Sequence, residues 1–179
     1  SKKCYEFSTK RIAHPTFKEI QKLVRKTHKY TGVQPKIILI TSPSHCGKST
    51  ALEYYCENYN EQFSASSDEF CFEPVLYIEL DSEITVTGLL VLILKALGVT
   101  RARATDRVSD LLGHVTEKLK LYKIELVILD EIQHLVPETG PITTQKIADH
   151  IKSISNKTKV PFILSGLPRA KKLLRLSQL

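Results

Sequence analysis

An apolar strand that leads into a glycine–lysine–serine turn constrains this chain more than any other feature. Residues 37–50 are Ile-Ile-Leu-Ile-Thr-Ser-Pro-Ser-His-Cys-Gly-Lys-Ser-Thr. The last three positions of the pattern G-x-x-x-x-G-K-[ST] are matched by Gly47, Lys48 and Ser49, whereas Ser42 stands in place of the first glycine. The sequence therefore predicts a strand, a phosphate-binding loop and a helix in direct succession.

The backbone of such a loop makes a nucleotide phosphate the expected ligand. Successive N–H groups at the positive end of a helix surround phosphate oxygens. Lys48 is expected to reach the β- and γ-phosphates and Ser49 to ligate Mg²⁺. GTP is disfavoured because no N-K-x-D sequence follows a strand, so ATP and Mg²⁺ are the expected cofactors. The other loop residues expected to bind the nucleotide are Ser44, His45, Cys46, Gly47 and Thr50.

A second apolar strand ends in two carboxylates. Residues 126–129 are apolar, and Asp130 and Glu131 follow them. Strands buried on both faces of a parallel sheet have continuous apolar runs, and open α/β sheets bind ligands at the carboxyl ends of their strands. We expect Asp130 to hold Mg²⁺ and Glu131 to polarise an attacking water. The adjacent glutamate favours hydrolysis over a small-molecule kinase.

A third polar residue ends the predicted strand 161–165. If this strand lies between the first and third strands, Ser165 lies beside the γ-phosphate and is a candidate catalytic residue. The alternative is a serine that merely begins a turn.

Strands and helices alternate along the whole chain, which indicates an α/β fold with a mostly parallel sheet between two helical layers. The predicted strands are 36–40, 75–80, 126–129 and 161–165. The predicted helices are 17–30, 48–59, 86–97, 106–121 and 144–155, with a basic helix from about 169 and a polar loop over 60–74. We expect residues 1–34 to form a linker and a basic helix, and 35–179 to form the nucleotide-binding core.

Positive charge suggests a polyanionic partner such as nucleic acid. The 179 residues carry a formal charge of +7, and such a balance favours nucleic-acid binding. The candidate DNA contacts are Lys18, Lys22, Arg25, Lys26 and Lys29 on one helix, and Arg101 and Arg103 in a loop. The alternative for each set is a solvated helix face or loop.

Several classes of protein are disfavoured. The longest apolar run, 88–94, is too short to span a bilayer, and no signal peptide is visible. The four cysteines lack C-x-x-C spacing, which disfavours a zinc site or a disulfide framework. A cytoplasmic protein without membrane partners is expected.

Four segments together resemble an AAA+ ATPase core and, more narrowly, the TnsC/TniB family, the ATPases that regulate target choice in DNA transposition. They are RIAHPTF (11–17), SHCGKST (44–50), LDEIQHL (129–135) and FILSGLP (162–168). The resemblance covers essentially the whole chain.

The resemblance implies an ATP-dependent protein that assembles on double-stranded DNA as a homo-oligomeric ring or filament. Such a protein recruits or licenses a transposase and works with target-selector proteins. Adenine contacts are then expected from Ile12 and His14. In AAA+ proteins an arginine from the next subunit completes the site and a helical lid follows the core. The resemblance places both after Leu179, so with the lid absent we expect these residues alone to bind nucleotide weakly and hydrolyse it slowly.

Two alternatives remain open from the sequence. One is another DNA-associated AAA+ ATPase, such as a replication initiator or helicase loader. The other is a nucleotide-gated scaffold with little hydrolysis, in which Glu131 is structural.

Overall fold

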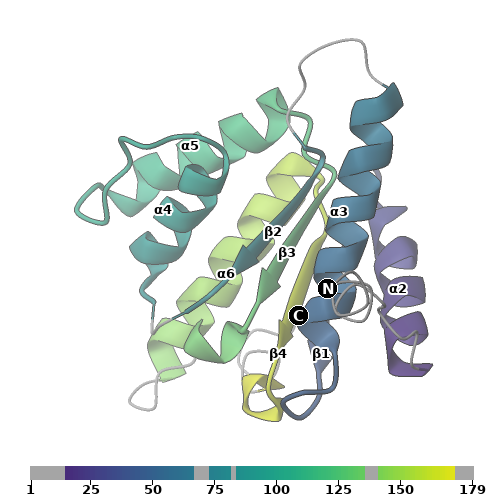
Figure 1. Ribbon diagram of the computed structural model, residues 1–179. Coiled ribbons are helices and arrows are strands. Elements are labelled where there is room, and N and C mark those ends of the chain that lie inside the picture. The colour runs from purple at the N-terminus through teal and green to yellow at the C-terminus, as the bar shows by residue number, and fades with distance from the viewer. Residues whose placement is uncertain (1–14, 67–72, 82–83, 136–140, 172–179) are drawn as a thin grey trace, which may run out of the picture.

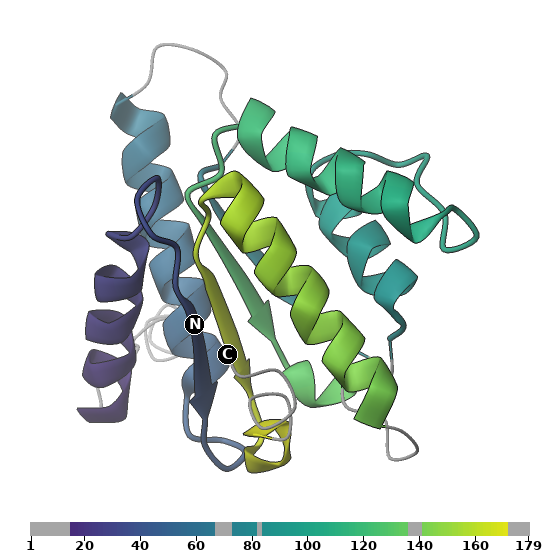
Figure 2. The same cartoon turned by 180° about the vertical axis from the view of Figure 1, so that it is seen from behind.

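A four-stranded parallel sheet lies between two layers of helices (Figures 1 and 2). The computed structural model describes residues 15–66, 73–81, 84–135 and 141–171. The strands are β1 (Ile37–Thr41), β2 (Val75–Glu79), β3 (Leu126–Asp130) and β4 (Phe162–Gly166). The helices are α2 (Pro15–His28), α3 (Lys48–Ser66), α4 (Val86–Ala96), α5 (Val108–Leu121) and α6 (Pro141–Thr158), with 3₁₀ turns η1 (Ile132–Leu135) and η2 (Pro168–Lys171). The predicted three-layer α/β fold is confirmed.

The strand order is β1-β4-β3-β2, with every neighbouring pair parallel. The last strand is thus inserted between β1 and β3, the arrangement on which the prediction for Ser165 depended. The register pairs Ile40 with Ser165 and Glu79 with Asp130. The carboxyl ends of all four strands therefore meet at one edge of the sheet, where β1 enters the predicted phosphate loop.

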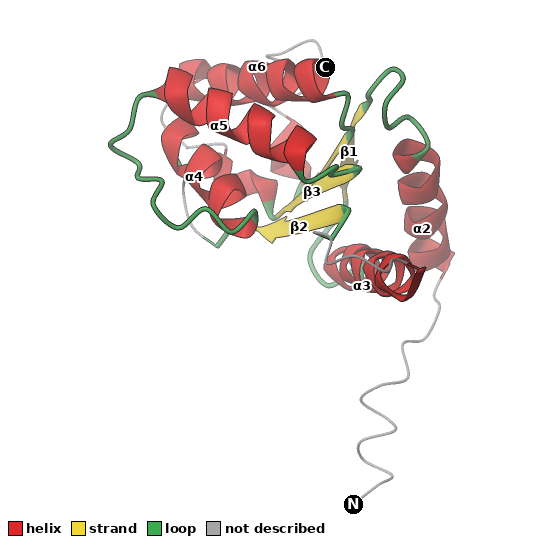
Figure 3. Cartoon of the chain, turned by 90° about the horizontal axis from the view of Figure 1, so that it is seen from above, coloured by secondary structure: helices red, strands yellow, loops and turns green. Residues whose placement is uncertain are grey.

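Each face of the sheet has its own apolar core. Helices α2 and α3 cover one face and α4, α5 and α6 cover the other (Figure 3). Alternate residues of β4 belong to different cores. Ile163 packs with α2 and α3, whereas Phe162 and Leu164 pack with α4, α5 and α6. All five residues of β3 and of β4 are buried, but all five of β1 are partly exposed.

Helix α3 is longer than predicted, because it continues to Ser66 through residues that the sequence assigned to a loop. Asn60, which the polar pattern placed in that loop, lies inside the helix and is buried. Its Nδ2 donates to the carbonyl of Val75 at 2.9 Å, and its Oδ1 accepts from the amide of Val75 at 3.0 Å. A side chain that usually favours turns is therefore satisfied by the start of β2.

The other boundaries differ by a few residues. Helix α2 begins at Pro15, a favoured first helical position, and α6 spans 141–158 rather than 144–155. The basic helix expected near Arg169 is the 3₁₀ turn η2 within the described residues. None of the described helices combines the length and apolar character needed to cross a membrane.

A partly buried polar cluster joins α2 to α3 and to Glu125. His28 Nδ1 lies 2.8 Å from the hydroxyl of Tyr55 on α3, and its Nε2 lies 3.0 Å from Oε2 of Glu125. The hydroxyl of Tyr59 donates to the same carboxylate oxygen at 2.7 Å. Burial lowers the pKa of His28, and the nearby Glu125 carboxylate opposes this shift. We call these four residues the His28 cluster.

Candidate nucleotide-binding site

The loop between β1 and α3 forms a concave backbone surface. His45 and Gly47 have positive φ values of 61° and 75°, and alternating left-handed residues turn successive N–H groups inward, as anion-binding loops do. Ser42 is not among the residues with positive φ, so serine is tolerated where the pattern has glycine. Its amide donates to the carbonyl of Gly166 at 3.4 Å and so continues the pairing of β1 with β4.

A cavity of about 360 Å³ opens over this loop. Its lining consists of Ser44, His45, Cys46, Gly47, Lys48, Ser49, Thr50 and Glu131. The structure thus brings all the predicted loop residues together with the second carboxylate of the Asp-Glu pair. The volume is within the range of small-molecule sites.

The ammonium group of Lys48 lies inside the loop. Lys48 is 5% exposed, and its Nζ donates to the carbonyls of Ser42 at 3.1 Å and Pro43 at 3.0 Å. Both acceptors are neutral, so an anion in the cavity would gain a charge-assisted hydrogen bond from Lys48.

Asp130 is fully buried at the end of β3. Its Oδ2 accepts from the hydroxyl of Tyr77 on β2 at 3.0 Å, and its Oδ1 accepts from the amide of Glu131 at 2.9 Å. Each oxygen keeps a further lone pair. Asp130 is not among the residues that line the loop cavity, whereas Ser49 is. The Asp130 carboxylate and the Ser49 hydroxyl would offer oxygen donors of the kind that Mg²⁺ prefers.

Tyr77 was not identified from the sequence. Burial, with the Asp130 carboxylate nearby, raises the pKa of its phenol well above the usual value, so the hydroxyl stays a donor. The only sequence signal was an aromatic residue within an apolar strand, and its role depends on the strand register.

Ser165 is the penultimate residue of β4, which lies between the two strands that carry the loop and the acids. It is fully buried, and its Oγ has no hydrogen-bond partner among the described residues. A buried hydroxyl without a partner is unusual in a folded protein. The orphaned Oγ therefore fits a site whose polar ligand supplies the missing hydrogen bond.

Gln133 is a second residue that the sequence did not identify. Its side-chain amide donates to Glu131 Oε2 and accepts from the amide of Leu167 at 3.0 Å. Ile12 and His14, the expected adenine contacts, lie outside the described residues.

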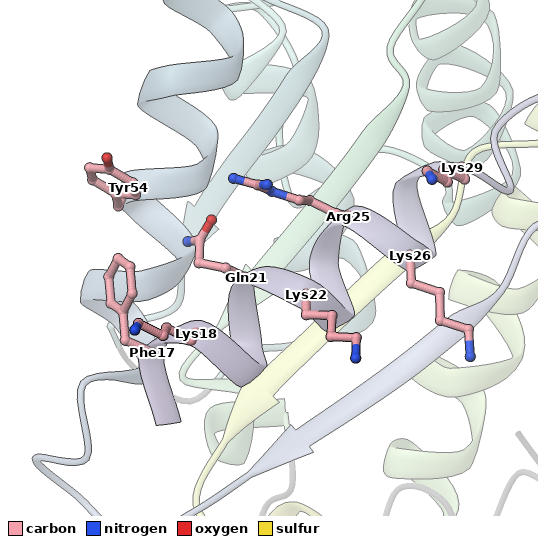
Figure 4. Close-up of a pocket in the computed structure, with 8 residues that line it drawn as sticks. All are labelled: Phe17, Lys18, Gln21, Lys22, Arg25, Lys26, Lys29 and Tyr54. Carbon is pink, nitrogen blue, oxygen red and sulfur yellow. The ribbon is translucent and has the colours of Figure 1, made fainter. Parts of the chain in front are cut away.

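The two candidate DNA-binding sets lie on opposite sides of the sheet. Helix α2 contributes to a groove of about 590 Å³ beside α3. Its lining consists of Phe17, Lys18, Gln21, Lys22, Arg25, Lys26, Lys29 and Tyr54. Figure 4 shows Arg25 pointing toward the rings of Phe17 and Tyr54, whereas Lys22 and Lys26 point away from them. Arg101 and Arg103 are exposed between α4 and α5, across the sheet from α2.

Comparisons with known proteins identify a matching sequence family and solved structures of similar fold. A sequence-family profile described as "TniB: Bacterial TniB protein" matches residues 6–178. No curated protein sequence matches the chain. The solved structures that resemble it include the ORC2 protein of Aeropyrum pernix in ADPNP–ADP complexes, at 16% identity and a TM-score of 0.61. Another is Cdc6p of Pyrobaculum aerophilum, at 17% identity and a TM-score of 0.62.

The alignments cover 92% and 93% of this chain but only 44% and 41% of the two archaeal proteins. At such low identity the similarity concerns the fold, which is that of a P-loop NTPase of the AAA+ type.

Proposed function

The chain belongs to the TniB family, and we propose that it is an AAA+ ATPase which assembles on DNA and recruits or licenses a transposase for target-site selection. One observation carries the proposal. The phosphate loop and Glu131, which are far apart in the sequence, line one cavity with the buried Lys48 ammonium.

The residues that line the cavity, together with Asp130 and Ser165, have separate roles in the proposed hydrolysis of ATP. The loop amides and Lys48 bind the β- and γ-phosphates. Ser49 and Asp130 would hold Mg²⁺, which would supply positive charge against the phosphates. The orphaned Oγ of Ser165 donates to a γ-phosphate oxygen. Ile12 and His14 remain the proposed adenine contacts.

Glu131 acts on water. A water oxygen forms a bond to the γ-phosphorus while the bond between this phosphorus and the β–γ bridging oxygen breaks. Glu131 orients the water and accepts its proton, and ADP leaves with the electron pair of the broken bond. ATP would favour the DNA-bound oligomer, and hydrolysis would reset it.

Helix α2 is the proposed DNA contact. Five exposed cations lie along the groove that it lines, against three, Arg101, Arg103 and Arg107, in the loop between α4 and α5. Cations spaced along one helix can neutralise phosphates without reading base sequence. The loop set belongs to a different side of the molecule and is not part of this surface.

Calorimetry with Mg-ATP on the full-length protein tests the nucleotide site. We expect saturable binding by the wild type and loss of binding by Lys48→Ala, because the loop loses the side-chain cation that faces the phosphates. Lys152→Ala, at an exposed position on α6, is the matched control and should bind as the wild type does. No heat of association with the wild type would refute the ATPase assignment.

The transposition role needs a separate assay. We expect DNA to be bound as an oligomer in the presence of Mg-ATP and to be released after hydrolysis. Glu131→Gln should trap the ATP-bound assembly, because the amide cannot accept the proton of the attacking water. If Glu131→Gln releases DNA as fast as the wild type, Glu131 is structural and the protein is a scaffold rather than a hydrolytic switch.

A further inference from the structure

One buried amide joins the carboxyl ends of β3 and β4. Gln133 in η1 is 4% exposed; its Nε2 donates to Oε2 of Glu131, and its Oε1 accepts from the amide of Leu167 at 3.0 Å. A carboxylate only accepts hydrogen bonds and a backbone N–H only donates them. The side-chain amide therefore has one orientation that satisfies both partners.

Gly166 leaves the space that this arrangement needs. A Cβ at position 166 would lie 2.6 Å from Oε1 of Gln133 and 3.0 Å from Cγ1 of Ile132. The first of these contacts would force the Gln133 side chain to move, and the second would require Ile132 to shift by a few tenths of an ångström. The close approach of the β4 terminus to Gln133 thus depends on a glycine at this position.

Glu131 depends on its surroundings for its position. Its φ of 56° lies in the left-handed region that few residues other than glycine adopt, and its amide is already used to hold Asp130. Glu131 is partly exposed and lines the phosphate-loop cavity. Without a restraint, such a side chain would exchange among several rotamers.

We propose that Gln133 is a positioning residue for ATP hydrolysis. It holds the Glu131 carboxylate at the cavity and couples that position to the turn after β4, through the amide of Leu167. This inference rests on the proposed function, in which Glu131 accepts the proton of the attacking water. A misplacement of about 1 Å in a catalytic group can lower the rate by about 100-fold, so the restraint is worth measuring.

Two variants of Gln133 remove different sets of its hydrogen bonds. Gln133→Leu removes both hydrogen bonds. Gln133→Glu keeps an acceptor for the amide of Leu167 but removes the donor to Glu131. In the full-length protein under conditions of ATP turnover, we expect both variants to lower kcat by roughly 10- to 100-fold. The KM for ATP should stay within about twofold of the wild type, because the missing interaction acts in the transition state.

A matched control measures how the loss of a buried side-chain amide far from Glu131 affects stability and kcat. Asn60→Leu also removes a side-chain amide that bonds to both backbone groups of one residue, but it lies between α3 and β2. It should lower the melting temperature and leave kcat unchanged. An equal loss of kcat in Asn60→Leu would overturn the inference, as would wild-type kcat in either Gln133 variant. Should Gln133→Leu fail to fold, Gln133→Glu alone decides.

A double-mutant cycle tests whether Gln133 acts through Glu131. In the Glu131→Gln background, single-turnover rates should not fall further when Gln133→Leu is added, because the group that it positions is already gone. Additive losses would overturn the inference. If the wild type binds Mg-ATP but never hydrolyses it, the proposed function fails and this inference fails with it. Wild-type hydrolysis that is insensitive to Gln133 refutes only the inference.

Discussion

The hydroxyl of Tyr77 on β2 donates a hydrogen bond to Oδ2 of Asp130 on β3, over 3.0 Å. The two residues lie on adjacent parallel strands, with Tyr77 paired in register to Ile128 and Asp130 two positions further along. The bond gives a fully buried side-chain oxygen a hydrogen-bond partner, and a buried polar atom without one would cost free energy. Tyr77 therefore supports the proposed metal ligand from a strand that carries no loop residue of the candidate site.

Replacing Tyr77 by phenylalanine should destabilise the protein. The change leaves an oxygen of the buried Asp130 carboxylate without its donor, which costs about 1–3 kcal/mol. Urea unfolding of the wild type and of Tyr77→Phe, both without nucleotide, measures the difference in unfolding free energy. Tyr30→Phe is the control, because it keeps the ring that Lys36 approaches at 4.0 Å and should change stability by less than about 0.5 kcal/mol. Equal stability of Tyr77→Phe and the wild type would contradict the assigned role of the phenol.

Gly47→Ala should cost about 1–2 kcal/mol of unfolding free energy, the typical penalty for an L side chain in the left-handed region. The φ of Gly47 is 75°, yet nothing lies within 4 Å of the Cβ that alanine would add. The loss is therefore conformational rather than steric.

Gly113→Ala is the matched control for Gly47→Ala. Position 113 lies within α5, has equally open surroundings and no positive φ. Alanine should stabilise this helix by about 0.5–1 kcal/mol. The same sign of change at both positions in thermal or urea unfolding would contradict the backbone explanation.

Acid should weaken the folded state through His28. Burial lowers the pKa of His28 below its ordinary value of 6.5, so below this pH the unfolded chain binds a proton that the folded protein resists. Stability is therefore present above about pH 6.5 and is lost as the pH falls, by at most about 1.4 kcal/mol per pH unit for one proton. Glu125, Tyr55 and Tyr59 face the imidazole, so their interactions with it also contribute to the measured change in unfolding free energy with pH.

The free energy of unfolding is measured at pH 7.5 and at pH 5.5 for the wild type and for two histidine variants. His28→Gln should show a shallower decline than the wild type, because an amide has no proton to bind in this range. His114→Gln, at an exposed position on α5, should decline in parallel with the wild type. A steeper decline in His28→Gln would mean that the imidazole binds its proton more tightly in the folded protein than in the unfolded chain.

Charge removal on α2 should weaken DNA binding and its dependence on salt. The double variant Lys22→Ala/Lys26→Ala should lower the slope of log affinity against log salt by roughly 0.9 for each phosphate that is no longer neutralised. Arg101→Ala/Arg103→Ala removes the same charge from the other side of the sheet and should keep the wild-type slope. Filter binding or fluorescence anisotropy with Mg-ATP measures both. A wild-type affinity that does not change with salt would exclude phosphate contacts.

The consecutive parts of the site were predictable. β1, the phosphate loop and the start of α3 follow one another in the chain, so a local pattern was sufficient to locate Gly47, Lys48 and Ser49. The apolar run before Asp130 likewise predicted a strand buried on both faces, and all five residues of β3 are buried.

The contacts between distant segments were not predictable. Tyr77 and Gln133 act through partners 53 and 34 residues away, and no local periodicity reports such pairs. The extent of α3 was misjudged for the same reason, because Asn60 is satisfied by Val75 rather than by its own turn. In each case the deciding interaction exists only once the sheet has assembled.

Among the described residues, β1 is hydrogen-bonded to a neighbour on one side only, through β4. An edge strand with partly exposed side chains is a place where local opening costs less free energy than global unfolding. If β1 detaches from β4, the phosphate loop loses its attachment to the sheet, while β4, β3 and β2 can stay paired. Amide hydrogen exchange along β1 would then report how often the nucleotide site exists at all, and bound ATP should slow that exchange more than exchange in β2.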